Sequence, residues 1–102
     1  MKKSDKKSNR YKALVAQLPS CISGQVPVAV HHIKHHTGMG QKSPDYWCIP
    51  ITPSEHQHSN EAYHVIGKRK WEELHGITEI ELARQTQAIL KDKILIPEKY
   101  RL

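Results

Sequence analysis

Histidine is the residue type through which this sequence could do chemistry. The chain has eight histidines in 102 residues. His31 and His32 are adjacent at the end of the stretch PVAVHHI, and His56 and His64 follow further along. Neutral imidazole binds divalent metals and exchanges protons near pH 7. One member of the pair could therefore bind a metal ion while the other takes a proton from water, although adjacent histidines are more often ordinary surface or core-rim residues.

The elements that carry these histidines decide whether they can meet. Side chains alternate along a strand, so His31 and His32 point to opposite faces if the strand continues through them. If it ends there, both can reach one site. On a helix after Pro53, His56 and Asn60 are four positions apart, and His56 and His64 share a face if the helix persists. That helix could supply imidazoles to a site begun by His31, and two or three such ligands suit a catalytic divalent ion.

The first half of the chain predicts a helix and two strands. Residues 1–9 are polar and rich in lysine, and we interpret them as a disordered basic tail. Apolar side chains at helical spacing then predict a helix that ends at Pro19. The stretches QVPVAVHHI and YWCIPI are short and rich in β-branched residues, which predicts two strands. Because the loop KHHTGMGQKSPDY joins them, we expect the strands to pair in antiparallel orientation.

The second half predicts three helices and completes an α+β fold. Ser54 is a fair N-cap for a helix over 54–64, which Gly67 ends. The stretch KRKWEELHG predicts a second, short helix closed by Gly76. The T-x-x-E sequence that starts at Thr78 is a capping box for the last helix.

The composition predicts one basic domain inside the cell. We expect residues 10–96 to form this domain and residues 97–102 to form a short tail. Lys and Arg number 16 against 10 Asp and Glu, and the resulting net charge of +6 favours nucleic acid as a partner. Cys21 and Cys48 are not spaced as a metal-binding pair, and we interpret them as small buried apolar residues. No signal-peptide or membrane-span pattern appears, which predicts a cytoplasmic protein.

The order of the motifs resembles a known nuclease family. PVAVHHI is followed by GMGQK, then by IPI leading to a histidine, then by HVIGKRKWE and an acidic last helix. This series is similar to that of the HNH, or ββα-metal, endonucleases, and most of all to phage and prophage recombination-enhancement nucleases. The resemblance covers roughly residues 11–91. It implies a small ββα-metal (His-Me finger) fold with an N-terminal helix and additional C-terminal helices.

The resemblance implies a role for each candidate residue. His31, His56 and His64 would bind a divalent ion (Mg²⁺, Mn²⁺ or Zn²⁺). His32 would be the general base that activates water, and Asp45 would orient the loop or hydrogen-bond this base. The substrate would be single- or double-stranded DNA in a bacterial host cell, and a recombination protein could act alongside. Phosphate contacts would come from basic residues near the site: Lys34, Lys42, Lys68, Arg69 and Lys70.

Departures from the family pattern leave alternatives open. Glu55 stands where relatives often carry a second histidine. The spacing from His56 to His64 is also shorter than in relatives, so His58 or Asn60 could take the place of a helical ligand. The chain could instead be a catalytically degenerate nucleic-acid-binding module with the same fold. A structural zinc adaptor is the weakest hypothesis, because closed zinc sites usually use cysteine.

Overall fold

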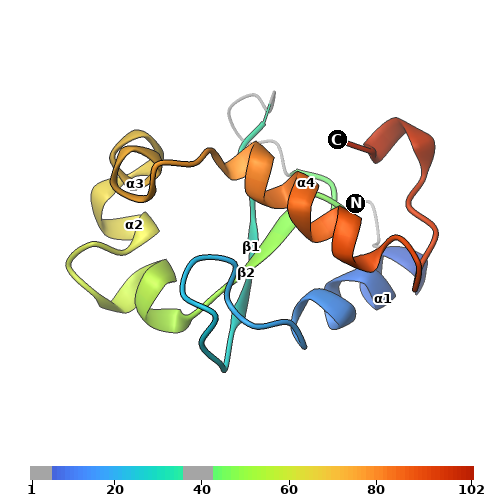
Figure 1. Cartoon of the computed structure of the whole chain (residues 1–102), viewed down its shortest axis with the longest axis horizontal. Coiled ribbons are helices and arrows are strands. Elements are labelled where there is room, and N and C mark those ends of the chain that lie inside the picture. Colours follow the sequence, from blue (N-terminus) through green and yellow to red (C-terminus); the bar gives the residue numbers. More distant parts are fainter. Residues whose placement is uncertain (1–5, 36–42) are drawn as a thin grey trace, which may run out of the picture.

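The structure is a computed structural model of the chain, and it describes residues 6–35 and 43–102. These residues form an α+β fold in which helices surround a two-stranded sheet (Figure 1). None of the helices in these two ranges is long and apolar enough to cross a membrane. In chain order the elements are α1 (Lys6–Val15), β1 (Ala29–His32), β2 (Cys48–Ile51), the π-helical turn η1 (Ser54–His58), α2 (Tyr63–Ile66), α3 (Lys68–His75), α4 (Glu79–Leu90) and the 3₁₀ turn η2 (Glu98–Tyr100).

The two predicted strands pair in antiparallel orientation, as expected. His31 lies opposite Ile49, and His32 lies opposite Cys48. Directly opposed residues project to the same face of a sheet, whereas successive residues project to opposite faces. Because β1 continues through both histidines, His31 and His32 point to opposite faces. This settles the first of the alternatives that the sequence left open.

Each face of the sheet packs on its own hydrophobic cluster. The cluster on the His31 face joins β2 to α2, α3 and the first half of α4, and its members are Ile33, Ile49, Ile51, Tyr63, Trp71, Leu82 and Ala83. The cluster on the His32 face joins β2 to α1 and the end of α4, and its members are Tyr11, Val15, Tyr46, Cys48, Leu90 and Ile96. Figure 1 shows α4 running across the strands, with α2 and α3 toward one end and α1 toward the other.

The N-terminal helix begins earlier than expected. Residues 6–9, assigned above to a disordered tail, are the first turn of α1, while residues 1–5 lie outside the described ranges. Ser8 is buried and donates a hydrogen bond from Oγ to Asp45 Oδ2 at 3.0 Å. This partner, 37 positions away, explains why a polar segment without apolar spacing is drawn into the helix.

Residues 97–102 are also not a loose tail, because they pack against the domain. Trp47 Nε1 donates to the carbonyl of Tyr100 at 2.8 Å. The side chain of Gln87 on α4 donates to the same carbonyl at 3.0 Å and accepts from the backbone N–H of Leu102 at 3.0 Å. The sequence shows no regular pattern in this segment because backbone groups make most of these contacts.

The single helix expected over residues 54–64 is wrong. The chain forms two short helices, with η1 ending at His58 and α2 beginning at Tyr63. Ser59 between them is extended, with φ −94° and ψ 164°. His56 on η1 and His64 on α2 therefore come from separate elements and do not share one helical face.

The hydrogen bonds that hold the start of η1 involve Thr52 and Glu55 and not the predicted cap Ser54. Thr52 and Glu55 form the two reciprocal hydrogen bonds of a capping box. Thr52 N donates to Glu55 Oε1 at 2.7 Å, and Glu55 N donates to Thr52 Oγ1 at 3.1 Å. Ser20 Oγ donates a second hydrogen bond to the same carboxylate oxygen, at 2.6 Å. Burial alone would raise the pKa of Glu55, but these hydrogen bonds lower it overall. The cap fixes where η1 leaves the sheet, and therefore where its histidines lie.

The C-terminal end of α3 and the N-terminal start of α4 lie where the sequence predicts them. Gly76 closes α3 in the left-handed conformation, with φ +67°. Thr78 caps α4 by accepting a hydrogen bond from the backbone N–H of Glu81 at 3.2 Å. This hydrogen bond fixes the position of the first turn of α4 beneath the His31 face of the sheet.

Candidate metal centre

Three histidines from three elements converge on one point. His31 comes from β1, His56 from η1 and His64 from α2, and one ring nitrogen of each lies within 4.8 Å of the others. The Nε2 atoms of His56 and His64 are 2.9 Å apart. Two nitrogens that share a tetrahedral ion, with metal–nitrogen bonds of about 2.1 Å, lie about 3.4 Å apart. The observed spacings bracket this value, so the three donors fit a divalent ion after small side-chain shifts.

These are the three histidines proposed as ligands from the sequence. Of the two residues left open as replacements, His58 lies outside this group of three histidines. His58 is exposed at the end of η1, and Asn60, the other open replacement, is exposed between η1 and α2. The break in the expected helix explains how His56 and His64 still meet, since the chain turns back after Ser59 and brings α2 beside η1.

The electrostatics keep the imidazoles of His56 and His64 neutral. Burial, followed by the neighbouring charges of His31, His64 and His58, lowers the pKa of His56 to about 4. Burial and the same His31 also lower the pKa of His64. A neutral imidazole has a free lone pair on one ring nitrogen, which is what a metal requires. The exposed and half-buried members of the group are therefore ready to act as ligands at neutral pH.

His31 is the buried member of the group, and its closest partner was not singled out from the sequence. His31 is 3% exposed. Its Nε2 lies 2.8 Å from Oε2 of Glu79, which is fully buried in the first turn of α4. Tyr63 OH donates to the other oxygen of this carboxylate at 3.0 Å. The only signal in the sequence is position: Glu79 precedes Leu82 and Ala83 by three and four residues, which places it on the apolar face of the helix.

The predicted pair of His32 and Asp45 forms on the opposite face of the sheet. Nε2 of His32 lies 3.0 Å from Asp45 Oδ1, and the side chains are 39% and 16% exposed. The other oxygen of Asp45 accepts from Ser8 at 3.0 Å and lies 3.6 Å from Lys12 Nζ. A carboxylate only accepts hydrogen bonds, so in neutral His32 the Nε2 atom donates and Nδ1 is the free acceptor.

Two of the predicted phosphate-binding residues lie beside the histidine group. Lys68 Nζ donates to the backbone carbonyl of Lys34 at 2.7 Å and lies 3.7 Å from Glu79 Oε1. Lys34 Nζ lies 5.9 Å from the centroid of the Tyr63 ring. Both ammonium groups therefore border the group of three histidines.

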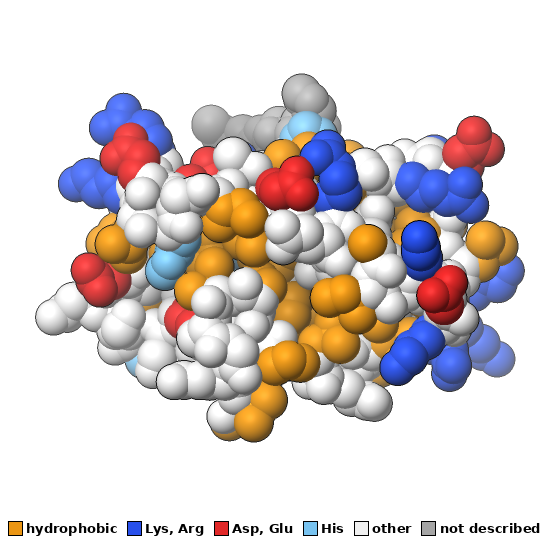
Figure 2. All heavy atoms as spheres, viewed as in Figure 1, with side chains coloured by type: hydrophobic (Ala, Val, Ile, Leu, Met, Phe, Trp, Pro, Cys, Tyr) orange, Lys and Arg blue, Asp and Glu red, His pale blue; other side chains and the backbone are white. Residues whose placement is uncertain are grey.

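The remaining basic candidates lie further along α3 or outside the described residues. Arg69 is exposed and forms an ion pair with Glu73 at 3.7 Å. Lys70 is exposed. Lys42 lies in the range 36–42, which the structure does not describe. In the view of Figure 2, Lys and Arg side chains gather toward the two ends of the molecule, over α3 and around α1 and the C-terminal segment.

The cysteines take no part in the histidine group. Cys48 is buried, Cys21 is half-buried, and both are free thiols. Burial is the main cause that raises the pKa of each thiol to about 12. The prediction that they are apolar packing residues fits this, although Cys21 is less buried than Cys48.

We expect both thiols of the folded protein to resist alkylation. A rise of the pKa from 9.0 to about 12 leaves about 1,000-fold fewer thiolates at pH 8, and thiolate is the reactive species. Iodoacetamide should therefore label the native protein at least roughly 100-fold more slowly than the chain unfolded in guanidinium, as followed by mass spectrometry. The raised pKa also means that these thiols favour folding below pH 9 and lose that contribution as the pH rises toward 12. Rapid labelling of Cys48 in the native protein would contradict its burial.

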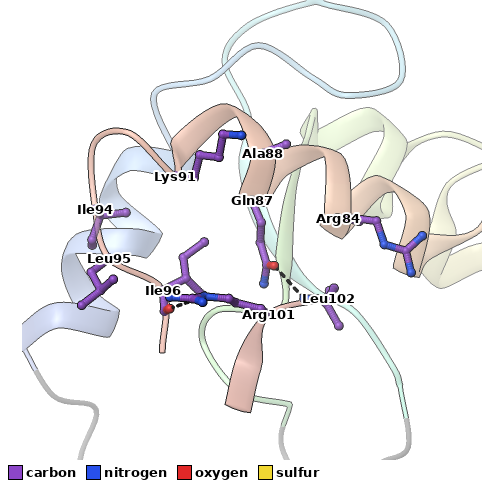
Figure 3. Close-up of a pocket in the computed structure, with 9 residues that line it drawn as sticks. All are labelled: Arg84, Gln87, Ala88, Lys91, Ile94, Leu95, Ile96, Arg101 and Leu102. Atoms are coloured by element: carbon purple, nitrogen blue, oxygen red, sulfur yellow. Dashed lines mark hydrogen bonds between the residues drawn. The ribbon is translucent and has the colours of Figure 1, made fainter. Parts of the chain in front are cut away.

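A separate pocket lies toward the other end of α4 (Figure 3). Its volume is about 390 Å³, and it contains no histidine, aspartate or glutamate side chain. It is therefore not part of the metal centre. Its lining residues are Arg84, Gln87, Ala88, Lys91, Ile94, Leu95, Ile96, Arg101 and Leu102.

Comparison with known proteins gives a family without an assigned activity. None of the curated proteins compared with the chain matches it. Residues 1–91 match a family described as a protein of unknown function, DUF968. This range contains all three histidines of the metal centre, the His32–Asp45 pair and Glu79. Because the match spans most of the chain, this protein belongs to the DUF968 family.

Proposed function

We propose that this protein is a metal-dependent HNH (ββα-metal) endonuclease that hydrolyses DNA phosphodiester bonds with low sequence specificity. The observation that carries the proposal is the convergence of His31, His56 and His64. The elements that deliver the first two are a strand and the helical turn after the second strand, in the order β1, β2, η1. This order supports the ββα-metal architecture that the sequence motifs imply.

The donor set suits catalysis better than a structural role. A divalent ion held by three imidazoles would polarise a phosphodiester and stabilise the charge that develops in its hydrolysis. A structural zinc site is closed by four ligands, usually including cysteine, and the cysteines here lie elsewhere. His64 is exposed, so water and a phosphate can approach the group from its side.

His32 is the proposed general base. Its Nε2 faces Asp45, which leaves Nδ1 as the nitrogen that accepts a proton from water. Asp45 is held in turn by Ser8 and Lys12, so the imidazole orientation is supported from α1. A carboxylate behind a histidine fixes the tautomer and stabilises the imidazolium that forms.

The charge of the protein supports a polyanionic substrate. The net charge is +6, and Lys34 and Lys68 border the histidine group. Contacts of lysine with phosphate position a nucleic acid without reading its sequence. The resemblance to phage and prophage nucleases supports the proposal that this activity serves recombination.

The test is cleavage of supercoiled plasmid and of single-stranded DNA by the purified protein. We expect nicked and then linear products with Mg²⁺, Mn²⁺ or Zn²⁺, and none with EDTA. The same preparation should show DNA binding that weakens steeply as salt increases. Absence of cleavage with every metal, on DNA that the protein binds, would overturn the nuclease proposal.

One observation favours a second candidate, a nucleic-acid-binding module without catalysis. His31 and His32 lie on opposite faces of the sheet, so one phosphate must reach around the end of β1 to meet both. A protein that kept the fold but lost this arrangement would bind DNA with or without metal and cut none. The cleavage assay separates the two candidates directly.

A further inference from the structure

Glu79 is a carboxylate in a position where a charge needs compensation. Its exposed fraction is zero, and it lies among the apolar residues of α4 that face the sheet. Moving an ionised carboxylate out of water is strongly unfavourable unless partners replace its hydration. A helix of this kind would be more stable with an apolar residue at this position, so the partners of Glu79 indicate what the carboxylate is for.

Each carboxylate oxygen has its own partner. Oε2 lies 2.8 Å from Nε2 of His31, a ligand of the proposed metal centre. Oε1 accepts a hydrogen bond from Tyr63 OH at 3.0 Å and lies 3.7 Å from Lys68 Nζ. The backbone N–H of Glu79 donates to Glu72 Oε2 at 2.6 Å, which anchors the start of α4. The carboxylate is thus held from α2 and α3 while one oxygen faces His31.

This arrangement fixes which nitrogen of His31 is free. An ionised carboxylate accepts hydrogen bonds and cannot donate them, so Nε2 of His31 carries the proton that Oε2 accepts. In neutral imidazole the other nitrogen, Nδ1, then carries the lone pair. A metal-binding histidine commonly donates its second ring N–H to a carboxylate, which sets its tautomer and orientation and makes it a stronger ligand.

We propose that Glu79 is a positioning residue that holds His31 as the Nε2–H tautomer and so presents Nδ1 to the ion shared with His56 and His64. The proposal rests on the metal centre of the proposed function. Glu79 is not itself a ligand, since no carboxylate joins the group of three histidines among the described residues. Lys68 would have two roles. Its ammonium group would face an incoming phosphate, and it balances the buried charge of Glu79.

The first test compares zinc affinity in matched variants by titration calorimetry with Zn²⁺ alone. Glu79→Gln keeps the shape of the side chain but removes its charge, and we expect zinc to bind about 10- to 100-fold more weakly. Glu81→Gln is the matched control: it makes the same change in the same first turn of α4, at a carboxylate that pairs with Arg84 at the surface. We expect it to change zinc affinity less than about 3-fold. Equal zinc affinity in folded Glu79→Gln and wild type would overturn the proposal.

The second test needs no variant and therefore does not depend on whether Glu79→Gln folds. Long-range ¹H–¹⁵N NMR spectra of the wild type report the tautomer of His31 without metal and the nitrogen that binds Zn²⁺. We expect a protonated Nε2 in both states and zinc on Nδ1. Zinc on Nε2 of His31, or an Nδ1–H tautomer in the metal-free protein, would overturn the proposal. A wild type that binds no zinc would instead overturn the metal centre, while the tautomer still reports on Glu79.

Discussion

Replacing His64 with Ala should weaken binding of a divalent metal at least roughly 100-fold and leave the fold unchanged. His64 supplies one of three converging nitrogens, and two imidazoles hold an ion much less well than three. Its side chain is exposed, so the truncation removes little packing. Thermal unfolding with added Zn²⁺ measures both properties, because a ligand that binds only the folded state stabilises it according to its concentration and affinity.

The expected size of this effect can be stated. At a zinc concentration 100 times the dissociation constant of the wild type, stabilisation is about 2.7 kcal/mol. A variant that binds 100-fold more weakly would gain only about 0.4 kcal/mol at the same concentration. His58→Ala is the matched control, since His58 is an exposed histidine of the same region outside the group. Equal losses in the two variants would mean that the ligand set is different.

Replacing His32 with Ala should reduce DNA cleavage by about 10²- to 10⁴-fold, the usual contribution of a general base. Zinc binding should stay as in the wild type, because His32 lies on the other face of the sheet from the three ligands. Single-turnover cleavage of a labelled duplex at saturating protein measures the chemical step without the effect of DNA affinity.

Asp45→Asn should fall between wild type and His32→Ala in the same assay. The amide keeps one acceptor but no longer stabilises a protonated His32 at 3.0 Å. A His32→Ala variant that cuts DNA as fast as the wild type would show that another group takes the proton. Retained zinc binding in that variant would leave the metal centre standing, so the two parts of the site are tested separately.

The parts of the fold that could be predicted are those in which local sequence and tertiary structure agree. The β-branched stretches around His31 and Ile49 form the sheet, Gly76 closes α3, and Thr78 caps α4. The single helix expected over residues 54–64 does not form, because the stretch SEHQHSNEAYH has no stripe of apolar residues that could pack a long helix against the core. Short polar side chains such as Ser59 also compete with the helix for backbone hydrogen bonds.

The candidate site was partly visible in the sequence. Histidine is a common metal ligand, and the order of the motifs resembles that of the HNH endonucleases, so the three histidines of the group, His31, His56 and His64, could be named before their positions were known. Glu79 could not, because glutamate in the first turn of a helix is common and ordinarily complements the helix dipole. Only the tertiary contact with His31, across 48 positions of sequence, distinguishes this glutamate from Glu81, which pairs with Arg84 at the surface.

The wide sequence separation of the site has a consequence for folding kinetics. The contact between His31 and Glu79 closes a long segment of chain, and such contacts form only after the entropy of that closure has been overcome. A peptide containing η1 and α2 alone would bring together two of the three imidazoles and lack the buried one. The metal would therefore associate after the sheet and α4 have docked, so it should slow unfolding while leaving the rate of folding almost unchanged.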